Sequence, residues 1–167
     1  MAVRYSAIIK LAINRVRSHS LSLGTVHVER LEIGFRIGPM PPFFLQEGYV
    51  DTGSYLSIFP ERSWRRFAHE IHWPTTQEEA ALPKWCTSLR GIVGGKSACR
   101  LGRVAVELYS PQNLNKRIGP ANLLALFAFD NGAMRRPLLG LNGGSFDGRR
   151  LIIAKDRDRA FLCEVQP

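Results

Sequence analysis

Alternating apolar and polar positions predict that most of this chain is β-strand. Apolar residues alternate with polar or small ones over residues 26–37 and again over 104–108, which is the period of a strand with one buried face. An apolar run over 43–50 predicts a further strand, set apart by the glycine and prolines of 38–42, which favour a turn and interrupt a β-ladder. The sequence therefore predicts a mainly β protein in which the strand at 43–50 ends directly at Asp51.

Two segments show helical spacing. Pro60 opens a segment with Glu61 in its first turn and apolar side chains on one face as far as Ile71, which predicts a helix of about three turns. Residues 1–24 carry basic residues and no acidic ones, and they predict either a short amphipathic helix or an added strand, with a transit peptide or a mobile arm as further alternatives. We therefore divide the chain into a basic N-terminal extension, residues 1–24, and one domain over residues 25–167.

The other segments are polar connections and apolar runs. Residues 75–84 and 111–120 are predicted to be loops. Residues 121–129 are predicted to be a strand or a buried helix, because the pattern of this apolar segment does not distinguish the two. The runs 151–154 and 160–163 flank a charged turn and predict a terminal hairpin.

Length and composition predict one soluble, folded domain. The chain has 167 residues, of which 45% are hydrophobic and 22% charged, and it has no apolar run of about 18 residues, so we expect no membrane span. The net charge of +9 comes mostly from arginines scattered along the chain. Without a long basic run or a known nucleic-acid-binding motif, we expect no specific nucleic-acid partner.

Cysteine and histidine positions do not indicate a metal site. Cys86, Cys99 and Cys163 are odd in number and lack CxxC spacing, so we expect free thiols that behave as small apolar residues in a reducing, cytoplasmic compartment. His69 and His72 lie three residues apart, but no third ligand follows at a usual spacing. We expect neither a metal nor an organic cofactor.

The candidate chemistry lies in residues 49–54, where an apolar strand leads into Asp51, Thr52 and Gly53. A hairpin with a glycine-rich tip at 91–95 follows. A phosphate-binding role for this tip is weakly supported, because a strand and not a helix comes after it. Later in the chain an apolar pair and a glycine stand together at 138–140.

In this order, the Asp-Thr-Gly-Ser stretch, the glycine-tipped hairpin, the alternating strand at 104–108 and the Leu-Leu-Gly element resemble the retropepsin-like aspartic proteases, which are single-domain relatives of the retroviral proteases. The resemblance covers residues 31–165 and implies a closed β barrel with a flap hairpin and one or two short helices. It implies a homodimer, because the family builds its site from two chains and this sequence has no second Asp-Thr-Gly or Asp-Ser-Gly. The glycines at 143 and 144 disfavour the short helix that family members start near this point.

The resemblance also implies roles for individual residues. The predicted catalytic loop is Asp51, Thr52 and Gly53. Its predicted supports are Ser54, Leu138, Leu139 and Gly140. The predicted flap over a peptide or protein substrate is Gly91, Ile92, Val93, Gly94 and Gly95. The Ser54 hydroxyl could donate to Asp51 and favour its charged form, which would shift the pH optimum to acid.

These features predict an aspartic endopeptidase, active as a homodimer, in which two Asp51 carboxylates activate a water molecule. The alternative is a catalytically silent retropepsin-like module for dimerisation or peptide binding, because an intact motif alone does not establish activity. A basic nucleic-acid-binding β domain is a third possibility, and it rests on charge alone.

Overall fold

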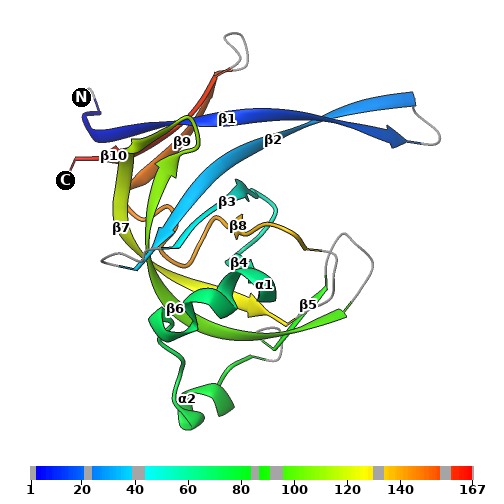
Figure 1. Ribbon diagram of the computed structural model, residues 1–167, viewed down its shortest axis with the longest axis vertical. Helices are drawn as coiled ribbons and strands as arrows, with labels where there is room; N and C mark the ends of the chain where they lie inside the picture. The colour runs from blue at the N-terminus through cyan, green and yellow to red at the C-terminus, as the bar shows by residue number, and fades with distance from the viewer. Residues whose placement is uncertain are drawn as a thin grey trace.

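A computed structural model of the protein describes residues 3–20, 24–38, 44–83, 87–90, 96–129, 134–154 and 159–166 (Figure 1). In chain order the elements are β1 (Tyr5–Ser20), β2 (Gly24–Ile37), β3 (Phe44–Val50), β4 (Ser57–Pro60), α1 (Glu61–Trp64), the 3-10 helix η1 (Arg65–Glu70), α2 (Thr76–Ala80), β5 (Ser88–Arg90), β6 (Lys96–Ser110), β7 (Asn113–Ala128), β8 (Leu138–Leu139), β9 (Arg149–Ala154) and β10 (Arg159–Val165). Strands dominate, so the prediction of a mainly β protein with few helices is confirmed. No helix among the described residues has the length and apolar character that crossing a membrane requires.

The strands form one sheet that closes on itself. Neighbouring strands follow the order β5-β6-β7-β4-β8-β3-β2-β1-β10-β9, and β2 also pairs with β6. This second pairing, between residues 34–37 and 106–109, completes a ring of β2, β3, β8, β4, β7 and β6. β10 and β9 extend the sheet beyond the ring, on the side where the two chain termini lie (Figure 1).

Aromatic side chains fill the inside of the ring. The Phe59 ring packs edge-on against Phe35, with 5.6 Å between centroids, and stacks on Phe127 at 5.5 Å. The predicted alternation is confirmed in two strands, whose inward residues are almost fully buried: Ile33, Phe35 and Ile37 in β2, and Val104, Val106 and Leu108 in β6. The core therefore follows the two-residue period of the strands.

A second apolar cluster lies on the other face of β4 and β7. Ala125 and Phe127 of β7 face the main core, whereas Leu126 and Ala128 join the second cluster. Because both faces of this part of β7 are covered, residues 123–128 are apolar without interruption. Residues 121–128 belong to a strand, which resolves the choice between strand and helix left open by the sequence.

β1 shows that the helix prediction for the N-terminal segment is wrong and that the strand alternative holds. Residues 5–11 of β1 pair with β10, and residues 12–20 pair with β2 to form a long hairpin that projects from the body of the molecule (Figure 1). Ile9 and Leu11 of β1 are 0% and 1% exposed and belong to the main core. The proposed division at residue 24 falls at the start of β2, and it stays a prediction.

The helix predicted after Pro60 is present in two parts. Pro60 is the N-cap of α1, and the chain continues as η1 with a kink at Phe67. Trp64 and Phe67 from these two helices are buried against the ring. The apolar face was therefore predicted correctly, although the helix is not continuous.

Two predicted loops are wrong. Within 75–84 the structure has α2, which starts with a capping box: the Glu78 N–H donates to the Thr75 hydroxyl, and the Glu78 carboxylate accepts from the Thr75 N–H. The Thr75 hydroxyl also donates to the Glu78 carboxylate, at 2.8 Å, and the bonds from the Thr75 N–H and, secondarily, from this hydroxyl lower the pKa of Glu78 below its usual range. Residues 113–120 belong to β7 and pair with β6, although nearly all are exposed.

The terminal hairpin is confirmed, with β9 antiparallel to β10. Cys99 and Cys163 are both buried, and burial raises the pKa of the Cys163 thiol. Cys86 lies outside the described residues.

Candidate functional site

Asp51 directly follows β3, which lies between β2 and β8 in the sheet. On one side, Val50 pairs with Leu31 of β2. On the other side, the Asp51 N–H donates to the Leu139 carbonyl at 3.0 Å. The backbone that carries the carboxylate is therefore held by a strand on each side, and the side chain itself is partly exposed.

The loop after Asp51 is closed by hydrogen bonds from its own backbone. The Gly53 N–H donates to Asp51 Oδ1 at 3.0 Å, and the Ser54 N–H donates to the Asp51 carbonyl at 3.2 Å. Thr52 and Gly53 are exposed at the tip. An N–H aimed at one carboxylate oxygen fixes the orientation of the side chain without removing it from solvent.

Ser54 does not make the predicted contact with Asp51. Its hydroxyl donates instead to the Leu56 carbonyl at 2.7 Å. The expected acid shift of the pH optimum rested on a bond to the Asp51 carboxylate, and it therefore loses its physical basis. Ser54 stabilises the turn out of the loop.

β8 lies between the two strands that the Asp51 loop connects. It runs parallel to β3, pairing Leu138 with Tyr49 and Leu139 with Val50, and it also pairs with β4 through Ile58. Leu139 is fully buried in the main core, and Leu138 packs against the second cluster. The structure thus brings both leucines to the base of the loop.

Gly140 approaches the loop backbone too closely for any other residue. A Cβ at this position would lie 2.3 Å from the Leu56 carbonyl carbon and 2.4 Å from its oxygen. The next residues continue the contact, because the Leu141 N–H donates to the Ser54 carbonyl at 3.0 Å. Residues 138–142 therefore support the loop along its returning arm.

A buried serine pair below the loop was missed from the sequence. The Gly140 N–H donates to Ser57 Oγ at 3.2 Å, Ser57 and Ser145 hydroxyls lie 3.0 Å apart, and Ser145 donates to the Asn142 carbonyl at 3.1 Å. Ser57 and Ser145 are both 0% exposed. A lone serine within the apolar run at 56–59 was the available signal, since a buried hydroxyl requires partners.

The region that follows β8 is a series of turns. Gly143 and Gly144 have φ angles of +74° and +91°, which other residues rarely adopt. No helix occurs in residues 141–148, in line with the helix-disfavouring glycines noted in the sequence.

Two exposed apolar side chains beside the loop were also missed. Tyr55 is 65% exposed and Leu141 is 40% exposed. Their segments are tied together, since the Asn142 N–H donates to the Tyr55 carbonyl at 2.9 Å. They give the loop an apolar flank, a feature common at contact surfaces.

Charged groups surround the strand that leads to Asp51. The guanidinium groups of Arg30 and Arg136 each lie 5.3 Å from the centroid of the Tyr49 ring. Arg136 also pairs with Glu32 at 3.0 Å and lies 3.8 Å from Glu47. Tyr49, two residues before Asp51, is thus held by cation–π contacts.

The predicted flap is described at its base. β5 and β6 pair as a hairpin from Ser88–Ala98 to Arg90–Lys96, which confirms the hairpin. Gly91, Ile92, Val93, Gly94 and Gly95 lie outside the described residues. The base is anchored to β7, because the Phe129 N–H donates to the Ala98 carbonyl at 2.8 Å.

Potential metal ligands are not clustered within the described part of the chain, where no three His, Cys, Asp or Glu side chains come together. His69 and His72 are both exposed, and His69 Nε2 lies 3.4 Å from Glu70 Oε1. The chemistry that the site offers is that of one oriented carboxylate per chain.

Comparisons with known proteins give similarity in structure and none in sequence. No protein-family model matches the sequence, and no curated protein matches it. Among solved structures, the chain is similar to a retropepsin-like aspartic protease from Rickettsia conorii, with 14% identity and a TM-score of 0.42 over 94% of this chain and 96% of that one.

Proposed function

We propose that this protein is an aspartic endopeptidase that hydrolyses peptide bonds as a homodimer, with Asp51 of each chain forming the catalytic pair. The observation that carries the proposal is the placement of Asp51. The carboxylate stands on a tight, solvent-accessible loop that β2 and β8 hold from both sides and that the Gly53 N–H orients. A catalytic group needs this combination of fixed geometry and access to substrate.

The chemistry follows from bringing two such carboxylates together. At roughly 3 Å apart two carboxyl groups cannot both ionise cheaply, so they share one proton; the carboxyl pair of aspartic proteases is the standard example of this effect. The ionised Asp51 accepts a proton from water as the water oxygen attacks the peptide carbonyl carbon. The protonated Asp51 donates to the carbonyl oxygen, and the proton then passes to the leaving nitrogen as the C–N bond breaks.

The other loop residues have supporting roles in this proposal. Thr52, exposed at the tip, binds the matching loop of the second chain. Gly53 keeps its N–H on Asp51 and leaves room for substrate, since a Cβ there would lie 3.3 Å from Asp51 Oδ1. Residues 91–95 at the end of the β5–β6 hairpin cover the bound peptide as a flap.

A second chain is required because this sequence contains a single Asp-Thr-Gly. Tyr55 and Leu141 are exposed apolar side chains on the flank of the Asp51 loop, where a second copy or a peptide would bury them. Dimer formation and activity should therefore rise together with protein concentration.

The test combines cleavage with mass. Wild-type protein, Asp51→Asn and Asp147→Asn are incubated with a mixed peptide library from acidic to neutral pH. Asp147 is the other aspartate among the described residues and is exposed, so its variant is a matched control. We expect cleavage by the wild type and by Asp147→Asn, and none by Asp51→Asn, together with a dimer of the 18.8 kDa chain by light scattering.

The other outcomes separate the alternatives. Cleavage by Asp51→Asn at the wild-type rate, or by a strictly monomeric wild type, would contradict the shared site. A stable dimer that binds peptides and cleaves none at any pH would instead establish the silent dimerisation or peptide-binding module.

A further inference from the structure

A pocket of about 260 Å³ lies at the opposite end of β3 from Asp51. Its walls come from residues 44–47 of β3, from α1 and η1, and from residues 135 and 137 before β8. Partly exposed Phe44 supplies aromatic surface, and fully buried Phe67 packs behind it, with ring centroids 6.1 Å apart. The pocket is therefore a concave site with an apolar wall, which is the usual form of a small-molecule site.

The pocket is rich in positive charge. Arg62, Arg66 and Arg135 line it, and Glu47 is the one acidic residue among its lining residues. Glu47 already lies 3.8 Å from Arg136, which is not a lining residue. Within the described part of the chain, none of the three lining arginines forms an ion pair with a carboxylate, whereas the neighbouring Arg65 pairs with Glu61.

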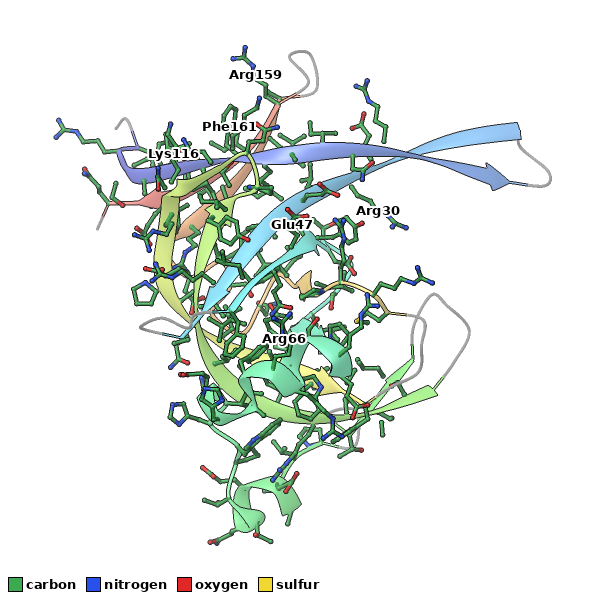
Figure 2. All side chains as sticks on the ribbon, in the orientation of Figure 1. Arg30, Glu47, Arg66, Lys116, Arg159 and Phe161 are labelled. Carbon is green, nitrogen blue, oxygen red and sulfur yellow. The ribbon has the colours of Figure 1, made fainter. Side chains whose placement is uncertain are left out.

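Two of these arginines are held in place by contacts with other lining residues. Arg62 Nη2 donates to the carbonyl oxygen of Arg135. The guanidinium carbon of Arg66 lies 5.9 Å from the centroid of the Phe44 ring. Figure 2 shows Arg66 on the helical segment below the strand that carries Glu47. Both side chains have therefore lost part of their conformational freedom before any ligand arrives, which lowers the entropic cost of binding.

We propose that this pocket binds the anionic group of a small ligand, a phosphate or a carboxylate attached to a compact apolar body. A guanidinium group offers planar, paired N–H donors that match the oxygens of either anion. The volume is near the lower limit of about 300 Å³ for small-molecule pockets, which fits a monophosphate or a short carboxylic acid and excludes a dinucleotide. The arginines converge in a hollow and do not follow a strip, so the geometry favours a small ligand over a nucleic-acid backbone.

The pocket is distinct from the Asp51 site and shares one structural element with it. Phe44 and Asp51 are separated by about 20 Å of extended chain. Pro137 lines the pocket, and its carbonyl accepts the Tyr49 N–H at 2.9 Å, immediately before β8 reaches Asp51. Binding can therefore be measured independently of catalysis, on wild type and on Asp51→Asn alike.

The experiment titrates inorganic phosphate, phenyl phosphate and benzoate into the full chain at constant ionic strength, set with sodium chloride, and follows heat and thermal unfolding. We compare wild type with Arg66→Gln and Arg62→Gln. The matched control is Arg159→Gln, an exposed arginine at the far end of the molecule (Figure 2).

We expect saturable binding of at least one probe and a rise in its Kd of roughly ten- to a hundredfold in Arg66→Gln, because one charge-assisted hydrogen-bonding group is lost. Arg159→Gln should bind as the wild type does. Phenyl phosphate binding more tightly than inorganic phosphate would identify Phe44 as the wall for the apolar body, and tighter binding of benzoate would identify a carboxylate ligand.

Three results would overturn the proposal: stabilisation equal to that of chloride at the same ionic strength, equal loss of binding in Arg159→Gln, or unchanged binding in both pocket variants. Circular dichroism of each variant checks that it is folded. If Arg62→Gln does not fold because its bond to the Arg135 carbonyl is lost, Arg66→Gln decides the outcome alone.

Discussion

Gly140→Ala tests whether β8 packs against the Asp51 loop as closely as the structure has it. The added Cβ would lie 2.3 and 2.4 Å from the Leu56 carbonyl carbon and oxygen, and 2.9 Å from the Ser57 nitrogen. All three are backbone atoms, so no change of rotamer relieves the contact. The two segments must separate by on the order of 1 Å to restore normal van der Waals distances.

Two effects set the size of the loss. Forcing an extra carbon into a packed interior costs about 1–3 kcal/mol. Separation also weakens the bond from the Gly140 N–H to the Ser57 hydroxyl, 3.2 Å long and buried, and an unpaired buried N–H costs about 1–3 kcal/mol. We expect the free energy of unfolding to fall by about 4 kcal/mol, which for a domain of this size lowers Tm by roughly 8–16 °C.

Urea unfolding followed by tryptophan fluorescence measures this loss. Trp64 is 6% exposed, and its indole N–H donates to the Ala128 carbonyl at 2.9 Å, so its emission reports the core. Gly53→Ala is the matched control: its Cβ would meet only Asp51 Oδ1, at 3.3 Å, and a side chain can move by a few tenths of an ångström. We expect that control to lose less than about 1 kcal/mol.

The reasoning is refuted if Gly140→Ala unfolds at the wild-type urea concentration or loses no more stability than Gly53→Ala. Either result would mean that β8 and the segment after the loop stand further apart in solution than in the structure.

Two further predictions concern buried polar groups. Ser57→Ala leaves the Gly140 N–H without its acceptor and should reduce the free energy of unfolding by about 1–3 kcal/mol, whereas Ser145→Ala, which keeps that acceptor, should cost less. Urea midpoints of the two variants and of the double variant measure this. Equal losses of stability from both single changes would contradict the role of Ser57, and not Ser145, as the acceptor of the Gly140 N–H. Burial, and secondarily the charge of Glu47, raises the pKa of Tyr109 above its usual range. The phenol of Tyr109 therefore contributes to the free energy of unfolding below about pH 10, and this contribution is lost as the pH rises through the folded-state pKa. Tyr109→Phe should flatten the fall in stability between about pH 9 and about pH 11, and an unchanged slope would exclude Tyr109 as its cause.

Local patterns in the sequence predicted the strands that have one buried face and one more exposed face. The alternation in β2 and β6 identified inward residues correctly, because one face of each strand is buried and the other is not. The strand into Asp51 was predicted from an apolar run after a glycine- and proline-rich turn, and the β5–β6 hairpin from its glycine cluster. The capping box of α2 was also readable at Thr75 and Glu78, three residues apart, although the segment was taken for a loop.

The same patterns did not predict strands in which both faces are exposed or both faces are buried. Residues 113–120 of β7 are almost all exposed, so they resemble a loop, and residues 125–128 are buried on both faces, so they do not separate strand from helix. β1 was ambiguous because its basic residues and its apolar ones fit either period. Residues 5–11 and 125–128 take their structure from pairing with strands far away in the sequence, β10 and β4, and no local signal encodes that pairing. Residues 113–120 pair with the preceding strand β6, and their exposure on both faces concealed the strand.

By itself, the sequence determined that this chain is mainly β, that a strand ends at an Asp-Thr-Gly stretch, and that each chain has one such stretch. These are properties of composition and short-range period, which residues a few positions apart fix through the backbone geometry. The tertiary structure alone decided that two leucines more than 80 residues later form the strand beside Asp51, that Ser54 turns away from the carboxylate, and that Arg62, Arg66 and Arg135 line one pocket. Those arrangements depend on which distant segments pack together, because contacts across a closed sheet are set by burial of the whole core.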